Sequence, residues 1–459
     1  MNYQTDEAKK LLEESVLSEG ERNFAEGLYF LYNGDYKNAL RNLEKAPTTG
    51  GGFDWKEYAK TMLLITNDFI SQKIDGFIVR CAPRDRIMMH YLKKVLPEIN
   101  KSMKKYFGEG AKDVALEIYP DRESFIKASL LTEEELERSG TVAISKFNRL
   151  MILSPRLLPY GYDWQDSVSH EYIHRIIGRK TAMNIPLYLN EGIARTFETL
   201  WREEKPVLSP SVKSALGRAR KEGFIEFEKF TRGMPSLSDQ SQVNLAFAEV
   251  NYLVYSMYEK RGVSEISRLL DDCGKTGFEE AFAGHFGAKE VFLNDYWEFL
   301  KNNLWEDKGA APDYIYWKKD DEFLTFSIRD FMRLGDRFRM AGENELALAQ
   351  YEKARQKEPE NYIVLVKIAK TRAATGDFEK AEEYFEKALS ASPSNFTCLA
   401  SFADFLFARA EYEKCASLIQ KALERNPFYG KGYEMLITIY KRCGLEKESE
   451  KNAELLKLL

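Results

Sequence analysis

The alternation of apolar and polar positions changes twice along the chain, from helical spacing to strand spacing and back. Four short segments in the middle are rich in β-branched and aromatic residues, which is typical of strands. They are residues 77–83, 113–120, 141–147 and 149–155. Between the first two, residues 86–108 repeat apolar positions with helical spacing up to a glycine, which predicts an amphipathic helix. After residue 165 the pattern is helical almost throughout, so strands followed by helices indicate an α+β domain.

The C-terminal part repeats one pattern of small and large residues every 34 positions. The matching sets are Pro359, Pro393 and Pro427; Gly342, Gly376, Ala410 and Gly444; Ala354, Ala388 and Ala422; and Gly335, Ala369 and Ala403. A small residue lets two helices cross closely and a proline stops the second helix, so each unit should be a helix pair. The pattern resembles tetratricopeptide repeats over residues 328–459, with three full units and one partial unit.

A fragment with the same internal spacing occurs near the N-terminus. Its matching residues are Gly27, Phe30, Gly34, Ala39 and Ala46. A single unit cannot bury both of its faces, so it must pack on its neighbours. We therefore expect a small helical domain over residues 1–75, the α+β domain over 76–305, and a linker over 306–327 whose first stretch, 306–314, contains glycine and proline.

Repeats of this kind present a concave surface that binds a peptide or a partner protein. They therefore predict a protein partner in the groove. Two alternatives stay open at this point. The repeats can act as a passive helical spacer, or another part of the chain can fill their groove.

Composition excludes several classes of protein. The length of 459 residues corresponds to about three domains, and an apolar fraction of 44% excludes wholesale disorder. The net charge of −5, from 67 basic and 72 acidic residues, lacks the basic excess of nucleic-acid-binding proteins. Five cysteines without CxxC spacing exclude a disulfide scaffold and fit a reducing compartment slightly better.

The sequence shows no membrane-spanning or export segment in the form given. The N-terminus lacks a basic stretch followed by an apolar one, and no apolar run approaches the length of about 18 residues that spans a bilayer. We therefore expect a soluble chain, cytoplasmic as given and periplasmic or secreted if an export signal was removed.

One motif carries metal chemistry. The segment HEYIH at 170–174 has the form HExxH, and on a helix His170 and His174 share one face, so both imidazoles can reach one ion. Zinc accepts neutral imidazole nitrogens and keeps a position open for water in catalytic sites. Glu171 is expected to face that water as general base. The alternative is a histidine pair on a helix without metal, but a charged Glu171 on a largely apolar helix would then be costly.

A second motif follows, and together the two resemble the gluzincin zinc metallopeptidases. The segment LYLNEGIA at 187–194 is similar to the LNEGxA pattern that follows HExxH in zinc aminopeptidases and in bacterial MA-like peptidase domains. The resemblance covers roughly residues 76–305 and implies that Glu191 is the third ligand of a Zn²⁺ cofactor, beside His170 and His174. The alternative is an ordinary carboxylate at a helix start, which the helix dipole favours.

Further candidates rest on the same resemblance. Relatives often have a tyrosine at the position of Phe247, which cannot donate a hydrogen bond to an oxyanion. Tyr252 is our candidate for that catalytic role, with Tyr255 beside it; both are otherwise packing aromatics. Glu198 and Asp166 are candidates for orienting the histidines, with a solvated charge and a helix cap as the alternatives.

The mode of cleavage is less defined by the sequence. The GAMEN motif with which aminopeptidases recognise a free amine is absent, which weakens an exopeptidase interpretation. Residues 140–143 stand where an edge strand would pair with an extended substrate. The other two histidines, His90 and His285, are interpreted as a surface residue and a structural residue.

The sequence thus predicts an α+β gluzincin-like metallopeptidase domain with all-α tetratricopeptide repeat regions at both ends. Its expected activity is zinc-dependent hydrolysis of a peptide or protein substrate, which the repeats recruit directly or through a partner. The alternative is a catalytically silent peptidase-like domain on an interaction scaffold, and Phe247 favours it. Metal-dependent hydrolysis of a non-peptide substrate is a third possibility.

Overall fold

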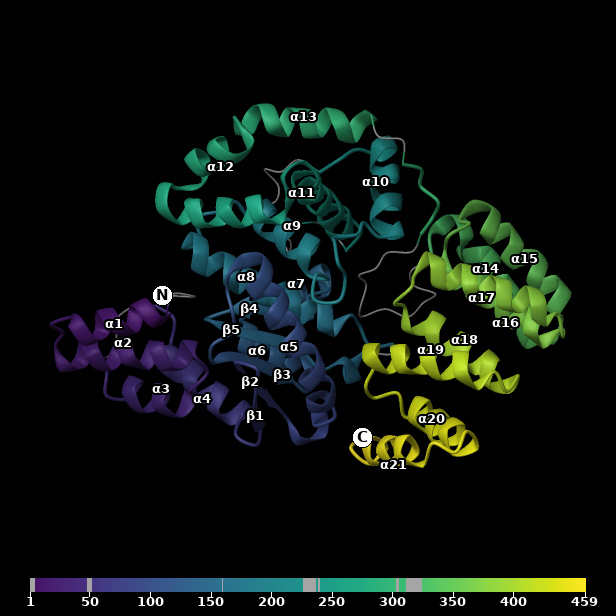
Figure 1. Ribbon diagram of the computed structural model, residues 1–459, viewed down its shortest axis with the longest axis horizontal. Helices are drawn as coiled ribbons and strands as arrows, with labels where there is room; N and C mark the ends of the chain where they lie inside the picture. Colours follow the sequence, from purple (N-terminus) through teal and green to yellow (C-terminus); the bar gives the residue numbers. More distant parts are fainter. Residues whose placement is uncertain are drawn as a thin grey trace.

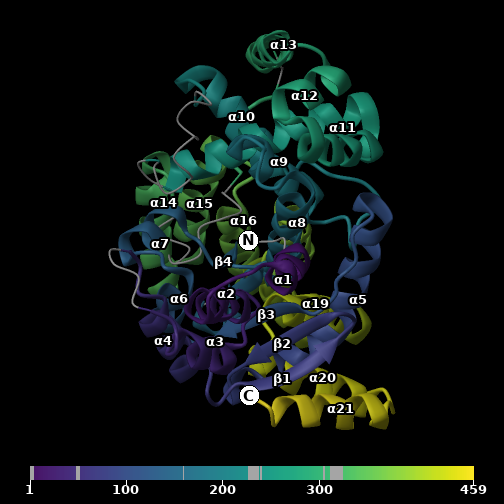
Figure 2. The same ribbon diagram turned by 90° about the vertical axis from the view of Figure 1, so that its left-hand side faces the viewer.

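Figure 1 shows the computed structural model, which describes residues 5–47, 52–158, 160–225, 237, 240–302, 305–310 and 324–459. A small sheet lies between the N-terminal helices on one side and a row of C-terminal helix pairs on the other. In Figure 2, helices α10 to α13 lie at one end of the molecule and α20 and α21 lie at the opposite end.

Four helices precede the sheet: α1 Thr5–Glu14, α2 Glu19–Tyr32, α3 Tyr36–Leu43 and α4 Trp55–Ile65. A capping box starts α2, because Ser18 and Glu21 each satisfy a backbone N–H of the other. The helices α2 and α3 pack closely on each other. The helix pair expected from the N-terminal fragment is therefore present.

Five strands form one mixed sheet: β1 Ile70–Ile74, β2 Phe77–Cys81, β3 Val114–Tyr119, β4 Ala143–Lys146 and β5 Arg149–Leu153. Their order is β1-β2-β3-β5-β4, with parallel pairing inside and an antiparallel strand at each edge. The four predicted strands are confirmed. The strand β1 was not predicted, because only its two end residues are apolar. The sheet therefore begins inside the segment 1–75 that we expected to be helical.

Helices cover both faces of the sheet. The side chains of each strand alternate between the two faces and so pack against both layers of helices. Leu150 and Ile152 pack in the core that holds α5 (Met88–Phe107) and α8 (Trp164–Thr181). Met151 and Leu153 pack in a second core, with α2 to α4 and α6 (Arg122–Ser129). The helix predicted over 86–108 is confirmed as α5, which ends at Gly108 with a φ of 72°.

The remaining helices of this part follow the sheet. They are α7 Glu133–Ser139, α9 Leu187–Phe197, α10 Pro210–Glu222, α11 Gln240–Thr276, α12 Phe278–Phe286 and α13 Lys289–Asn302, with 3-10 turns at Pro83–Asp85 and Pro155–Leu157. The long α11 is interrupted at Gly262, whose φ is 75°. The helices α8, α9 and α11 contact one another and hold the candidate site. In the part of the chain that the structure describes, no helix is long and apolar enough to cross a membrane.

The C-terminal part is a series of four helix pairs. Its helices are α14 Phe326–Met340, α15 Asn344–Lys357, α16 Tyr362–Ala374, α17 Phe378–Ala391, α18 Phe396–Ala408, α19 Tyr412–Arg425, α20 Gly430–Arg442 and α21 Glu446–Leu456. A Cβ atom at Gly335 would lie 2.4 Å from the Tyr351 ring, so a small residue is needed where α14 and α15 cross. The predicted linker 306–327 is described at 306–310 and 324–327, and the rest of it lies outside the described residues.

A buried polar network fastens the N-terminal helices to the sheet. Arg149 and Glu117, both with 0% exposure, form an ion pair of 3.1 Å between β5 and β3. From the helices, the Tyr36 hydroxyl donates to Glu117 at 2.6 Å and the Tyr58 hydroxyl accepts from Arg149 at 2.9 Å. The carboxylate and the guanidinium thus find partners without water, which a buried ion pair requires. The single repeat-like unit packs on the sheet, as the sequence required.

The C-terminal repeats dock on the start of α8. Trp164 donates its ring N–H to the backbone oxygen of Glu424 at 2.8 Å, and Arg425 pairs with Asp163 at 2.8 Å. A further bond of 2.7 Å joins the hydroxyls of Tyr91 and Tyr433. The third and fourth repeats are therefore bound to the same helix that carries the HExxH motif and to α5 beside it.

Candidate metal centre

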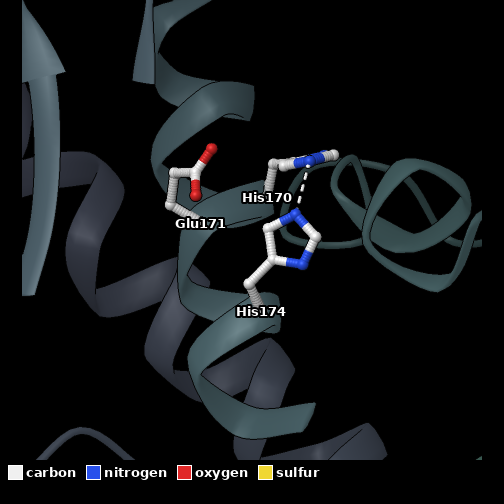
Figure 3. A group of neighbouring side chains, drawn as sticks. All are labelled: His170, Glu171 and His174. Atoms are coloured by element: carbon white, nitrogen blue, oxygen red, sulfur yellow. Dashed lines mark hydrogen bonds between the residues drawn. The ribbon is translucent and has the colours of Figure 1, made fainter. Parts of the chain in front are cut away.

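Two neighbouring helices supply the side chains of the site. The buried helix α8 carries His170, Glu171 and His174, and α9 carries Glu191. Figure 3 shows the two imidazole rings meeting at their nitrogens, with the Glu171 carboxylate beside His170. His170 and His174 share one face of α8 because positions four apart on a helix lie above one another.

The three predicted ligand atoms form a small triangle. The Nε2 atoms of His170 and His174 are 3.0 Å apart, and Oε2 of Glu191 lies 3.6 and 3.5 Å from them. Zinc bonds of about 2.0–2.1 Å in a tetrahedral site place neighbouring ligand atoms about 3.3–3.4 Å apart. The triangle therefore has the size of one face of a zinc coordination tetrahedron. The residues present fit the ion.

Each histidine is held through its other ring nitrogen. Nδ1 of His170 lies 2.9 Å from Oε2 of Glu198, and Nδ1 of His174 lies 2.9 Å from Oδ1 of Asn190. An acceptor at Nδ1 leaves the Nε2 lone pair directed at the centre of the triangle, which is the usual arrangement of metal-binding histidines. Glu198 thus takes the orienting role that the sequence suggested.

The electrostatics of the metal-free site follow from close packing of acids and bases. Burial opposes a charge on His170, but the carboxylates of Glu191 and Glu198 outweigh it and raise its pKa to about 10. The pKa of His174 is also raised, since Glu191 outweighs the effect of burial. The two histidines lower the pKa of Glu191 despite its burial. Binding a cation would require these protons to leave, which couples metal affinity to pH.

Glu171 lies next to the two histidines. A ligand atom of its carboxylate and one from each histidine lie within 4.8 Å of one another. Burial raises the pKa of Glu171, while the backbone of Ser145 in β4 donates a hydrogen bond to it. A buried carboxylate beside two imidazoles can act as a metal ligand or as a proton acceptor next to an ion.

A cleft of about 340 Å³ opens over these residues. One wall is the chain from Ser139 to Ser145, which includes the start of the edge strand β4. The other walls are largely apolar, with Leu131, Met183, Leu187, Val243 and Phe247 among the lining residues. The predicted edge-strand segment 140–143 therefore lies beside the candidate metal site.

The structure does not bring Tyr252 to this cleft. Phe247 lines it, but a residue five positions later on a helix is turned by about 140°, and Tyr252 packs instead among aromatic rings. Its ring is 4.6 Å from Trp305 and 5.7 Å from Phe299, centroid to centroid. Tyr255 packs on the same cluster. The interpretation of both as packing aromatics fits the structure, and the catalytic role expected for Tyr252 does not.

Of three other candidates, two have structural partners and the third, His90, lies on a helix away from the cleft. Asp166 accepts hydrogen bonds from Trp201 and Arg202, at 2.9 to 3.0 Å, and does not orient a histidine. His285 lies between Glu265 and Asp272, at 2.8 and 3.0 Å, as a structural histidine. His90 is half-buried on α5.

Sequence reasoning missed two residues of the site. Asn190 directly precedes Glu191 and holds His174, although the LNEG segment itself gave the signal. Arg195 lines the cleft and binds Glu198, and nothing in the motif pointed to it. Both become visible only once α9 is placed against α8.

Comparisons with known proteins identify the C-terminal part. Residues 332–396 and 372–437 match two family models described as tetratricopeptide repeat. The chain therefore contains tetratricopeptide repeats at residues 332–437, as the 34-residue spacing predicted. Both matches lie outside the α+β region, whose metallopeptidase assignment stays a prediction. No curated protein matches the sequence.

Solved structures show similarity to the chain over about a quarter of its length. The MamA protein is 22% identical, with 28% of this chain and 71% of that chain covered and a TM-score of 0.27. The first TPR of Spaghetti (RPAP3), bound to the HSP90 peptide SRMEEVD, is 18% identical over 26% of this chain and 96% of that chain, with a TM-score of 0.25. A thermophilic TPR protein in Thermus thermophilus is 20% identical over 28% of this chain and 72% of that chain, with a TM-score of 0.25.

Proposed function

We propose that this protein is a zinc-dependent peptidase with a tetratricopeptide-repeat binding region. The observation that carries the proposal is the triangle of His170, His174 and Glu191, with ligand atoms 3.0 to 3.6 Å apart. It is reinforced by acceptors at both Nδ1 atoms, which fix the ring orientation that directs each Nε2 atom toward a shared ion.

The residues of the site have separate roles in the proposed reaction. A zinc ion, when bound, supplies Lewis-acid polarisation of a carbonyl and activation of water. His170, His174 and Glu191 would hold it. Glu171 accepts a proton from the attacking water and passes it to the leaving amine, and its raised pKa suits a group that must both take and return a proton.

The edge strand β4 is the proposed site for the substrate backbone. It pairs with β5 on one side, and its start forms a wall of the cleft beside Glu171. An extended peptide can add to such an edge through main-chain hydrogen bonds. The apolar walls would receive side chains of the substrate. This arrangement supports a peptide rather than a small non-peptide substrate.

The repeats supply the partner-binding part of the proposal. Tetratricopeptide repeats are protein-interaction modules, and these are joined to α8 through Trp164 and Arg425. A protein held on the repeats would therefore be kept near the cleft. We propose that the repeats recruit the substrate or a protein that delivers it.

The replacement Glu171→Gln tests the peptidase function. The variant should keep stoichiometric zinc, measured by mass spectrometry, and lose hydrolysis of a proteome-derived peptide library. Glu249→Gln is the matched control, since Glu249 is another buried glutamate and does not line the cleft. Hydrolysis that persists in the purified Glu171→Gln protein would contradict the proposed mechanism.

The second candidate is a catalytically silent domain on a repeat scaffold. It is favoured by the family matches, which lie in the repeats, and by Phe247, which offers no hydrogen-bond donor to an oxyanion. Metal analysis of protein purified without added metal separates a metal site from none. A zinc-loaded protein that cleaves no peptide in the library would establish a silent metal-binding domain.

A further inference from the structure

An ion pair on α9 stands directly behind the candidate metal site. Nη1 of Arg195 lies 2.6 Å from Oε1 and 2.8 Å from Oε2 of Glu198, so one nitrogen bridges both carboxylate oxygens. The side chains are only 11% and 6% exposed. The same Oε2 atom is 2.9 Å from Nδ1 of His170. A continuous chain of contacts therefore runs from the guanidinium through the carboxylate to a predicted metal ligand.

Phe247 adds a further contact to this series of side chains. The guanidinium carbon of Arg195 lies 5.7 Å from the centre of the Phe247 ring, within the range of a cation–π contact. Among the described residues that line the cleft, Arg195 is the only lysine or arginine. Three carboxylates line the same cleft, those of Glu171, Glu191 and Glu198, and Arg195 contacts the last of them.

We propose that Arg195 is a positioning residue of the metal centre, held by Phe247 and acting through Glu198 on His170. The inference rests on the metal site of the proposed function. The bridge from Nη1 to both oxygens fixes the orientation of the carboxylate, and the carboxylate fixes the ring of His170. Without the bridge, Glu198 can rotate, and Nε2 of His170 is no longer held toward Glu191.

This inference also gives Phe247 a role. The ring of Phe247 lies against the guanidinium of Arg195 and helps to hold it. A tyrosine ring would present the same face, so this contact does not depend on the departure from the family pattern. Lysine cannot replace Arg195 fully, because an ammonium group is a compact charge without a planar fork and packs less well on a ring.

Zinc affinity tests the proposal without relying on peptide hydrolysis. The apo-protein is titrated with zinc in competition with a chromophoric chelator. We expect Arg195→Met to weaken zinc binding about 10- to 100-fold, the range found for residues that support metal ligands. Arg195→Lys should lose less. Arg218→Met is the control, since Arg218 on α10 pairs with Asp307 and does not line the cleft, and it should bind zinc as the wild type does.

A double-mutant cycle separates action through Glu198 from a general effect. If Arg195 acts through the carboxylate, adding Arg195→Met to Glu198→Gln should weaken zinc binding little beyond the single Glu198→Gln change. Losses that multiply would overturn the proposed route. If Arg195→Met does not fold, the same cycle with Arg195→Lys gives the answer.

Two outcomes distinguish this inference from the proposed function. A wild-type protein that binds no zinc would remove the metal centre itself. A wild-type protein that binds zinc, with an Arg195→Met variant of equal affinity and normal thermal stability, would overturn only the role of Arg195. Peptide hydrolysis is not a readout of this test, since zinc binding is measured directly.

Discussion

Two adjacent residues on α9 contact the histidines in different ways. Asn190 accepts from Nδ1 of His174, while Glu191 directs Oε2 between the two Nε2 atoms. Successive residues on a helix point about 100° apart, so two neighbours can reach the side and the centre of one site. A single substitution in this segment would therefore change either the orientation of a ligand or the ligand set.

At the same scale, we predict that Tyr252→Phe leaves both zinc content and peptide hydrolysis unchanged. The ring of Tyr252 lies among aromatic residues of α11 and α13 and is not part of the cleft. Hydrolysis rates of the variant and the wild type, measured on the same peptide, check this. A loss of more than about tenfold, or 1.4 kcal/mol in transition-state free energy, would return Tyr252 to the site.

A second prediction at this scale concerns Glu249, which is fully buried on α11. The backbone N–H of Ile225 donates to its Oε1 at 3.0 Å, and Oε2 has no partner among the described residues. The titratable group that contacts its backbone is Tyr296, whose hydroxyl donates to the backbone oxygen of Glu249. Burial raises the pKa of Glu249 from 4.5 to about 8.

The sign of the pH effect follows from this shift. The folded protein keeps the proton up to about pH 8, whereas the unfolded chain releases it near pH 4.5. The contribution of Glu249 to stability is therefore complete below pH 4.5 and is lost as the pH rises to about 8, at about 1.4 kcal/mol per pH unit. Glu249→Gln should flatten this slope in urea unfolding at pH 5 to 8. An unchanged slope would contradict the prediction.

At the scale of the element, a glycine sets the distance between α9 and α11. A Cβ atom at Gly192 would lie 2.6 Å from the backbone oxygen of Val250 and 2.7 Å from a methyl group of Val254. The two helices can approach this closely only with glycine at that position. Since Gly192 follows Glu191 directly, the same contact fixes the depth of the third predicted ligand.

We predict that Gly192→Ala destabilises the fold by about 1–3 kcal/mol, the usual cost of overpacking, and weakens zinc binding. The matched control is Gly284→Ala on α12, where an added Cβ meets no atom within 4 Å. There alanine should stabilise the helix by up to about 1 kcal/mol. Chemical denaturation and chelator competition measure the two effects. Equal behaviour of the two variants would show that the α9–α11 contact tolerates a side chain.

Elements with a strong local pattern were predictable from the sequence. The strands β2, β3 and β5 consist almost wholly of apolar and β-branched residues, and α5 has regular apolar spacing. The strand β1 has the sequence ISQKI, whose polar middle gives no such signal, and it exists because β2 supplies a partner for its backbone. The two strands form a hairpin around Asp75 and Gly76, whose φ angles of 43° and 85° suit a two-residue turn, so Asp-Gly was a local signal that the sequence-based prediction did not use.

The candidate site divides in the same way. Spacing along α8 was sufficient to group His170 and His174, and the NEG segment added Glu191. The role of Glu198 was open from sequence, because a distance of seven residues along α9 does not say which histidine it meets. The catalytic role expected for Tyr252 does not fit the structure. Five residues along a helix correspond to a rotation of about 140°, which turns Tyr252 away from the cleft that Phe247 lines. For Glu198 and Tyr252, the direction of the side chain around the helix axis determined its contacts more than its position along the helix did.

At the scale of the whole molecule, the sheet region is held from both sides. Buried bonds among Tyr36, Tyr58, Glu117 and Arg149 join it to the N-terminal helices. On the other side, Asp163 and Trp164 at the start of α8 bind the third repeat. The repeats are therefore not a freely hinged appendage of the described structure. A force applied to the repeats would act on α8, the helix that carries the predicted ligands His170 and His174.

The docking of the repeats on α8 either affects the geometry of the candidate metal site or only holds the repeats in place. Arg425 pairs with Asp163 at 2.8 Å and lies 3.8 Å from Asp166, four residues before His170. Arg425→Met should cost about 1–3 kcal/mol of stability, because it breaks a largely buried ion pair, and make the repeats separate earlier on heating. Arg409→Met, which removes an exposed pair with Glu411 in the same repeat, is the control.

Zinc affinity of the Arg425→Met variant should stay within about threefold of the wild type, because Asp166 keeps its bonds to Trp201 and Arg202 and α8 keeps its own helical bonds. Calorimetry follows the separation of the repeats, and chelator competition follows the site. A tenfold loss of affinity without unfolding would mean that the docked repeats hold α8 in its binding geometry. In that case a partner protein on the repeats would have a direct mechanical route to the metal centre, through Asp163 and the first turn of the helix.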